Sequence, residues 1–315
     1  IVQGIPLLFG STGEIITEKS GNLNLGIPGI MYMGGSAGVI GAYIYEQSTA
    51  SPSPFWCIVI PLLSSILGSF LAALIYSFLT ITLRANQNVT GLALTTFGVG
   101  FGDFFGGSLT KIMSGGGNLS VKLTADYYKT TLPFADSLGA IGKIFFSYGF
   151  LAYVAVIIAI IASWFLNRTR CGLHLRAVGE NPATADAAGI NVIKYKYIAT
   201  CVGGIIAGLG GLYFIMDYTG GSWTNGGFGD RGWLAIALVI FALWRPNVSI
   251  LGSFVFGGLY IAYSYISGLS RSAVAIFNML PYVVTILVLI LTSVRNKKEN
   301  HPPASLGLAY FREER

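Results

Sequence analysis

Charged side chains are scarce in this sequence. Asp, Glu, Lys and Arg make up 10% of its 315 residues, whereas soluble domains carry roughly 25%. A chain with so little charge cannot cover a water-facing surface, and 53% of its residues are hydrophobic. Lipid must therefore be the solvent for much of the chain, and its 42 glycines suit helices that pack backbone to backbone in lipid.

Residues of catalytic and metal-binding chemistry are also few. Cys57, Cys171 and Cys201 are widely spaced and form no CxxC pair, so they indicate neither a disulfide framework nor a metal site. The sequence has two His, no GxxxxGK[ST] phosphate loop, no Ser/His/Asp set and no paired catalytic carboxylates. We therefore expect no enzymatic activity, no metal and no cofactor in this chain.

Long apolar runs dominate what remains. A bilayer core of about 30 Å needs about 20 apolar residues as a helix. The apolar stretches lie near residues 1–13, 27–46, 55–83, 89–107, 144–166, 193–216, 232–244, 248–267 and 279–294. They predict an all-α transmembrane bundle of about 9–10 helices. Since the chain begins inside an apolar stretch, we expect that stretch to be truncated and another helix to precede it.

The run 232–244 is too short to cross a bilayer alone, because its helix would span only about 20 Å. We expect a broken or re-entrant element, which lipid tolerates where it lines a cavity. Two polar, Gly-rich stretches, 13–29 and 220–232, interrupt the apolar pattern in opposite halves of the chain. They are consistent with the interrupted helices of inverted-repeat transporters, and equally with two ordinary Gly-rich loops.

The net charge of +6 comes from Lys and Arg at the ends of apolar runs, which indicates membrane topology rather than nucleic-acid binding. An alternating count of the membrane crossings places four cationic segments on one side: Arg84, Arg245, the connection 167–192 and the tail after 294. That side is cytoplasmic by the positive-inside rule. We assign residues 1–298 to the membrane domain and 299–315 to a cytoplasmic tail, with 108–143 outside.

The cytoplasmic connection 167–192 carries a short helix signal. Asn181 is suited to an N-cap, Pro182 to the first helical position and Gly189 to a stop. A solvated connector needs no capped helix beside a cationic strip, but a helix that docks a partner does. The pattern favours docking and leaves the connector as the alternative.

Four ordered motifs resemble a known family. They are Glu18-Lys19-Ser20-Gly21-Asn22-Leu23-Asn24-Leu25-Gly26-Ile27-Pro28-Gly29-Ile30-Met31, then Arg84 to Leu94, Leu175 to Ile190, and Gly229 to Pro246. Together they resemble the bacterial ABC importer permeases for branched-chain amino acids, simple sugars and nucleosides, and the nucleoside branch most of all. Pro28 stands where many nucleoside-type members carry an acidic residue, which leaves a simple sugar open as substrate.

The resemblance implies a multi-pass protein of the bacterial cell membrane with several partners. These are a cytoplasmic ATP-binding cassette subunit, which holds the Mg-ATP, a second permease subunit, favoured to be a different chain, and an extracytoplasmic substrate-binding lipoprotein. It also implies that residues 176–190 couple transport to the ATPase. The coupling residues are Arg176, Gly179, Glu180, Asn181, Pro182, Ala188 and Gly189.

The translocation path needs groups that replace the water around a polar solute without holding it tightly. Asn and Thr side chains with aromatic faces meet that need for a base and a ribose. We expect the path to include Asn22, Asn24, Asn88, Thr90, Phe97, Phe101, Trp223, Asn225 and Phe228. An amide in hydrocarbon is costly without a partner, whereas any single Phe is more often a packing or lipid-facing residue.

Charges at membrane depth are rare and usually functional. We expect Asp103 and Asp217 at the outer interface, and Glu14 and Glu18 with Lys19 at the inner mouth. Asp230 and Arg231 are expected to form a structural pair or a gate latch. The alternatives are an ion-coupled secondary transporter, which needs no coupling helix, and an intramembrane enzyme, for which Asp103 and Asp230 have no evident His or Cys partner.

Overall fold

The computed structural model describes all residues except 115–118, 132–138, 140–141, 143–144, 267, 269, 296–300 and 312–315. The regular elements of this described part are helices, and a single isolated bridge joins Ser120 and Ser222. The expected all-α class is therefore confirmed. The expected boundary between membrane domain and tail, at 298–299, lies outside the described residues, as does much of 108–143.

Each of the nine apolar stretches forms a helix. These helices are α1 (Gly4–Glu18), α2 (Ile27–Ser48), α3 (Pro54–Ser77), α4 (Gln87–Ser114), α7 (Phe150–Arg168), α10 (Val192–Tyr213), the short α11 (Arg231–Phe241), α12 (Pro246–Ile261) and α13 (Arg271–Arg295). Shorter helices are α5 (Lys122–Tyr128), α8 (Arg170–Glu180) and α9 (Pro182–Ala187). Two π-helical turns, Phe78–Thr82 and Phe214–Tyr218, extend α3 and α10.

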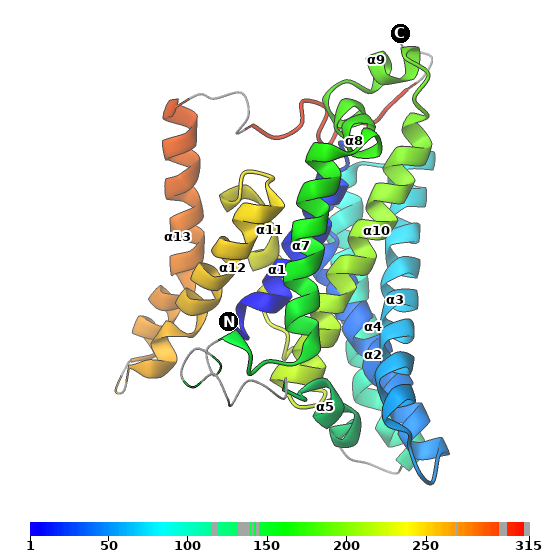
Figure 1. The fold of residues 1–315 in the computed structure, drawn as a ribbon, viewed down its shortest axis with the longest axis vertical. Helices are drawn as coiled ribbons and strands as arrows, with labels where there is room; N and C mark the ends of the chain where they lie inside the picture. The colour runs from blue at the N-terminus through cyan, green and yellow to red at the C-terminus, as the bar shows by residue number, and fades with distance from the viewer. Residues whose placement is uncertain are drawn as a thin grey trace.

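The helices divide into an inner and an outer set (Figure 1). Six described helical segments are long and apolar enough to cross a membrane. In the segments built on α2 and α10, 78% of the apolar window is buried, against 28% in α3 and 11% in α13. Because the outer helices expose large apolar side chains such as Leu67 and Ile290, their surroundings must be lipid.

Small residues allow the inner helices to approach closely. A Cβ on Gly13 of α1 would lie 2.2 Å from the carbonyl oxygen of Gly203 in α10. A Cβ on Gly211 would lie 1.9 Å from the carbonyl oxygen of Met31 in α2. Larger side chains would separate these backbones, so the abundant glycine has the packing role expected in lipid.

The short run in the second half is a broken element. Its helix, α11, has 11 residues, or about 16 Å at the usual rise. Leu243 and Trp244, both with φ of 53°, then turn the chain into α12. Figure 1 shows α11 and α12 beside each other, on the side of α1 that faces α13.

The two ends of the bundle differ in charge. Figure 1 places α8, α9 and the C terminus at one end, and α5 with the 219–230 connection at the other. The cationic connection between α7 and α10 lies at the first end, as does Arg84, whose guanidinium carbon lies 4.6 Å from the Phe311 ring centroid. This end is therefore the cytoplasmic one.

Candidate functional site

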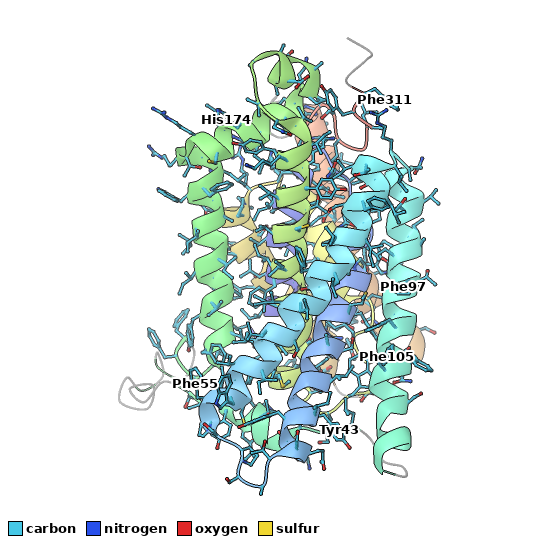
Figure 2. The ribbon with its side chains drawn as sticks, turned by 90° about the vertical axis from the view of Figure 1, so that its right-hand side faces the viewer. Tyr43, Phe55, Phe97, Phe105, His174 and Phe311 are labelled. Carbon is cyan, nitrogen blue, oxygen red and sulfur yellow. The ribbon has the colours of Figure 1, made fainter. Side chains whose placement is uncertain are left out.

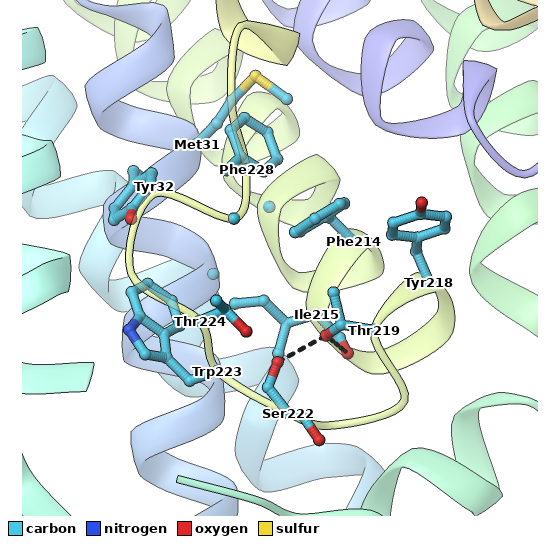
Figure 3. A pocket seen from close by; sticks show the side chains of 13 residues that line it. Met31, Tyr32, Phe214, Ile215, Tyr218, Thr219, Ser222, Trp223, Thr224 and Phe228 are labelled. Atoms are coloured by element: carbon cyan, nitrogen blue, oxygen red, sulfur yellow. Dashed lines mark hydrogen bonds between the residues drawn. The ribbon is translucent and has the colours of Figure 1, made fainter. Parts of the chain in front are cut away.

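An aromatic cavity of about 220 Å³ lies inside the bundle, between the first turns of α2 and the last turns of α10 (Figure 3). It is enclosed by α2, the last turns of α10 and the connection that follows them. The residues that line it are Met31, Tyr32, Gly35, Gly211, Phe214, Ile215, Tyr218, Thr219, Ser222, Trp223, Thr224, Gly227 and Phe228. Aromatic walls with a few hydroxyl groups are typical of a small-molecule site.

The connection 219–230 folds back over the cavity because hydrogen bonds hold the backbone of its first residues. The Gly221 N–H donates to the carbonyl of Ile215 at 2.8 Å, and the Thr219 hydroxyl donates to the carbonyl of Ser222 at 2.8 Å. The Trp223 N–H donates to the carbonyl of Leu119 at 2.8 Å. Gly221, with φ of +77°, supplies the left-handed conformation that the turn needs.

The rings stand at angles to one another around the cavity. Tyr32 meets Trp223 edge to face at a centroid separation of 5.3 Å, and Phe214 meets Phe228 in the same way at 5.1 Å. Phe214 also stacks on Tyr218 at 5.1 Å. Such edge-to-face contacts stabilise the walls and leave ring faces available to a flat ligand.

A hydrogen-bonded group joins three segments at the rim. The Tyr32 hydroxyl donates to Asp103 Oδ1 at 2.5 Å, and the Gly226 N–H donates to the Tyr32 oxygen at 2.9 Å. The Trp223 indole N–H donates to Asn225 Oδ1 at 2.9 Å. Asp103 thus helps to fix the loop over the cavity.

Arg231 supports the cavity from behind. Its guanidinium donates to the carbonyl of Phe228 at 2.9 Å and to Gln3 Oε1 at 3.0 Å. Its Cζ lies 4.5 Å from the centroid of the Phe214 ring, within cation–π range. Arg231 is 5% exposed, whereas Asp230 is exposed. The guanidinium of the buried arginine contacts rings, carbonyls and an amide.

The residues predicted for the path separate into three groups. Trp223 and Phe228 line the cavity, and Asn225 bonds to Trp223. Phe97 is 53% exposed and, with Phe101, belongs to a row of rings along α4, where Figure 2 labels Phe97. The other four, Asn22, Asn24, Asn88 and Thr90, lie at or near the cytoplasmic ends of the helices.

Asn22 and Asn24 are buried in the connection between α1 and α2. The Asn22 amide donates to Thr200 Oγ1 at 2.9 Å. The Asn24 N–H donates to Glu14 Oε1 at 3.0 Å, and Asn24 Oδ1 accepts the Gly26 N–H at 2.9 Å, just before α2 begins. These bonds give both asparagines a role in holding the turn.

The predicted acidic residues of the inner mouth are buried. Glu14 is 0% and Glu18 is 3% exposed. Glu18 Oε2 accepts a hydrogen bond from the Trp244 indole N–H. Glu18 therefore joins α1 to the turn between α11 and α12, whereas Glu14 joins it to Asn24.

The helix predicted in the cytoplasmic connection is α9. Asn181 Oδ1 caps it by accepting the Thr184 N–H at 3.0 Å, Pro182 begins it, and Gly189 follows with φ of +83°. The sequence did not predict α8, a second and longer helix. Ala188 and Gly189 are exposed at this end of the molecule, where a cytoplasmic partner could reach them.

Gly179 fixes α8 against the connection that follows α1. A Cβ at Gly179 would lie 2.3 Å from the carbonyl oxygen of Lys19, so only glycine allows this approach. Lys19 is partly buried here; burial lowers the pKa of its ammonium group, and the nearby Glu180 carboxylate opposes that shift. The connection between α7 and α10 is thus in contact with the residues that follow α1.

Several cavity residues were not predicted from the sequence. Phe214 and Tyr218 lie four residues apart at the end of an apolar run, a spacing that places two side chains on one helix face. That spacing, next to the Gly-rich stretch, was the available signal. Met31 ends the Glu18–Met31 motif, Tyr32 follows it, and neither carries a comparable pattern.

The fold and its two ends define a multi-pass membrane transport subunit. The family model for the permease component of branched-chain amino acid transport systems matches residues 1–289. The chain belongs to this family of permeases.

Curated relatives match over most of their length. The chain is 31% identical to a nucleoside ABC transporter permease of Lactococcus lactis, over 92% of this chain and 90% of the relative. It is 31% identical to a guanosine ABC transporter permease of Bacillus subtilis, over 92% and 89%. It is also 32% identical to a putative glucose ABC transporter permease of Haloferax volcanii, over 80% and 71%.

Proposed function

We propose that this chain is the permease subunit of an ATP-driven importer for nucleosides, and that the aromatic cavity is a station on their path. The observation that carries the proposal is the set of ring faces around that cavity, from Tyr32, Phe214, Trp223 and Phe228. Stacking on an aromatic side chain contributes about 1–3 kcal/mol per base. The nucleoside and guanosine permeases among the relatives support the same substrate class.

A simple sugar remains the second candidate, because one relative is named for glucose. A sugar exposes hydroxyl groups on every side and needs many hydrogen-bond partners. The cavity offers few: the Thr219 hydroxyl already donates to the backbone carbonyl of Ser222, and the walls are mainly rings and aliphatic groups. The composition of the cavity therefore favours a ligand with a flat apolar face.

The energy source is proposed to be a separate ATPase that docks at α9. Two further partners complete the proposed importer: a second permease subunit and an extracytoplasmic substrate-binding lipoprotein. Asn181 caps the start of α9, and Gly189 follows its last turn. The exposure of this short helix supports the docking. A short rigid helix at the cytoplasmic end can transmit a movement of the ATPase to α8 and α10.

The test is uptake by proteoliposomes that contain the whole importer. We expect ATP-dependent uptake of guanosine or adenosine, and little uptake of glucose or ribose. Uptake by this chain alone, driven by an ion gradient, would instead indicate a secondary transporter. Preferential uptake of a sugar would overturn the nucleoside assignment while keeping the importer.

The cavity is tested separately by Trp223→Ala. Loss of the indole should lower nucleoside uptake by roughly 5- to 100-fold, from the stacking energy above. Trp164→Ala is the matched control, because Trp164 on α7 is 60% exposed to the lipid side and lies outside the cavity. Equal uptake by the two variants would remove the cavity from the path.

A further inference from the structure

A second cavity, of about 150 Å³, lies at the cytoplasmic end of α10, opposite to the aromatic cavity. A single water needs only about 10–15 Å³ of such space. The second cavity thus has room for a small polar group and its neighbours. Its walls come from the connection between α1 and α2, the turn before α4, the start of α10 and the C-terminal tail.

The charge in this cavity is of one sign. Lys196 and Arg84 both line it, and none of the described lining residues is acidic. Lys196 is 3% exposed, yet within the described part of the chain its ammonium group has neither a hydrogen bond nor an ion pair. A buried cation without a partner is costly, and burial is expected where a ligand supplies the counter-charge.

Two helix ends add to this positive potential. Val192 and Ile193 begin α10 and line the cavity, and Gln87 begins α4 and lines it as well. The N-terminus of a helix carries a partial positive charge and unpaired N–H groups, which favour anions. Two such ends and two cations converge on one space.

The cavity also has a neutral polar wall. The Asn22 side chain is 1% exposed, and its Oδ1 is buried without a hydrogen-bond donor in the described structure. Its amide nitrogen is occupied by Thr200. An acceptor beside a cluster of donors suits a ligand that brings a hydroxyl or a protonated oxygen together with its negative charge.

We propose that this cavity binds a phosphate-bearing ligand through Lys196 and Arg84. Phosphate matches the site because it is anionic, compact and able to accept several hydrogen bonds at once. The group could belong to a soluble phosphate of the cytoplasm or to the headgroup of a phospholipid. A bound ligand would join α4, α10 and the tail residue Tyr310, which also lines the cavity.

The experiment measures thermal unfolding of the full-length purified permease in uncharged detergent. The probes are inorganic phosphate at constant ionic strength and dihexanoyl phosphatidylglycerol, with dihexanoylglycerol as the matched lipid without phosphate. Each probe that binds the folded protein raises the unfolding midpoint with concentration and yields an apparent Kd. Stabilisation by phosphate alone indicates a soluble ligand, and stabilisation by phosphatidylglycerol alone indicates a headgroup.

The variants connect the effect to the cavity. We expect Lys196→Gln to raise the apparent Kd at least tenfold. Lys194→Gln removes the same charge two residues away on the exposed surface, outside this cavity, and should leave the apparent Kd unchanged. Arg84→Gln changes an exposed lining residue and should raise it severalfold, which keeps the test decisive if Lys196→Gln does not fold.

Two results would overturn the proposal. One is a wild-type protein that neither phosphate nor phosphatidylglycerol stabilises beyond its matched control. The other is an equal rise of the apparent Kd in Lys194→Gln and Lys196→Gln. The effect would then come from overall charge and not from the cavity. The measurement involves no transport, so it stands apart from the proposed nucleoside function.

Discussion

Ser305 of the C-terminal tail donates two hydrogen bonds to one acceptor, the carbonyl oxygen of Gly179 in α8. Its backbone N–H does so at 3.0 Å and its hydroxyl at 2.6 Å. The Gly307 N–H donates to the carbonyl of Gly21 at 3.2 Å. The tail therefore ties α8 to the turn between α1 and α2.

Ser305→Ala tests this attachment. The variant loses the hydroxyl bond, worth about 0.5–1.5 kcal/mol, and keeps the backbone bond. We expect faster proteolytic removal of the tail from the purified permease, with the membrane domain intact. Ser51→Ala, at an exposed site on the opposite end, is the control and should change nothing. An unchanged cleavage rate in Ser305→Ala would show that the side chain does not hold the tail.

Ala188→Leu tests the docking of α9. Ala188 is exposed at the end of α9, so the larger side chain should leave the permease folded and obstruct a closely packed partner. We expect ATP hydrolysis by the assembled importer to persist while uptake falls at least tenfold. Ala275→Leu, exposed on α13, is the matched control. Normal uptake with Ala188→Leu would favour a simple connector.

Ala188 is preferred to Gly189 as the test position for a structural reason. Gly189 has a φ of +83°, a conformation that other residues adopt only with strain. A bulky residue there would disturb the turn after α9 as well as any partner surface. Loss of uptake in a Gly189 variant would therefore not distinguish docking from local unfolding.

Asn24→Leu tests whether Asn24 acts in the turn or in the path. The substitution removes the acceptor of the buried Gly26 N–H and is expected to lower stability by about 1–3 kcal/mol. Thermal unfolding of the purified permease measures this, with the exposed Asn88→Leu at the start of α4 as control. Lost uptake with unchanged stability would instead place Asn24 in the path.

The order and type of the helices could be predicted because each helix that crosses the lipid core needs about 20 apolar residues. Charge content and run length locate α2, α10 and α3 with its π-helical turn within a few residues, and cap chemistry at Asn181 locates α9. The helix α7 begins at Phe150, six residues after the start of the apolar run 144–166. The shortness of 232–244 predicts the broken helix α11. These signals are local in sequence, so a single chain is enough to show them.

The composition of the cavities could not be predicted in the same way. Tyr32 meets Asp103 and Gly226 across 71 and 194 residues, and no local pattern encodes such a meeting. The four-residue spacing of Phe214 and Tyr218 indicates one shared helix face, but it does not predict the π-helical turn Phe214–Tyr218 or the cavity that both residues line. The polarity of Asn22 and Asn24 at membrane depth predicted a function for both residues. Polarity alone does not distinguish a residue that contacts a ligand from a residue that holds a turn.

Tyr32→Phe tests the hydrogen bonds at the rim of the aromatic cavity. The ring and its edge-to-face contact with Trp223 remain, while the bonds with Asp103 and the Gly226 N–H are lost. Each neutral bond contributes about 0.5–1.5 kcal/mol, and a bond to a charged group about 1.5–3 kcal/mol. The loop over the cavity should therefore open more often, and its amide protons should exchange faster with solvent.

Hydrogen exchange over residues 219–230 measures that opening, and nucleoside uptake measures its consequence. Tyr265→Phe is the matched control, because Tyr265 is 81% exposed and lies away from the cavity. We expect faster exchange and a several-fold change in uptake only in Tyr32→Phe. Faster exchange with unchanged uptake would mean that the loop closes the cavity but does not control the passage of the nucleoside. The path would then have to lie beside the cavity.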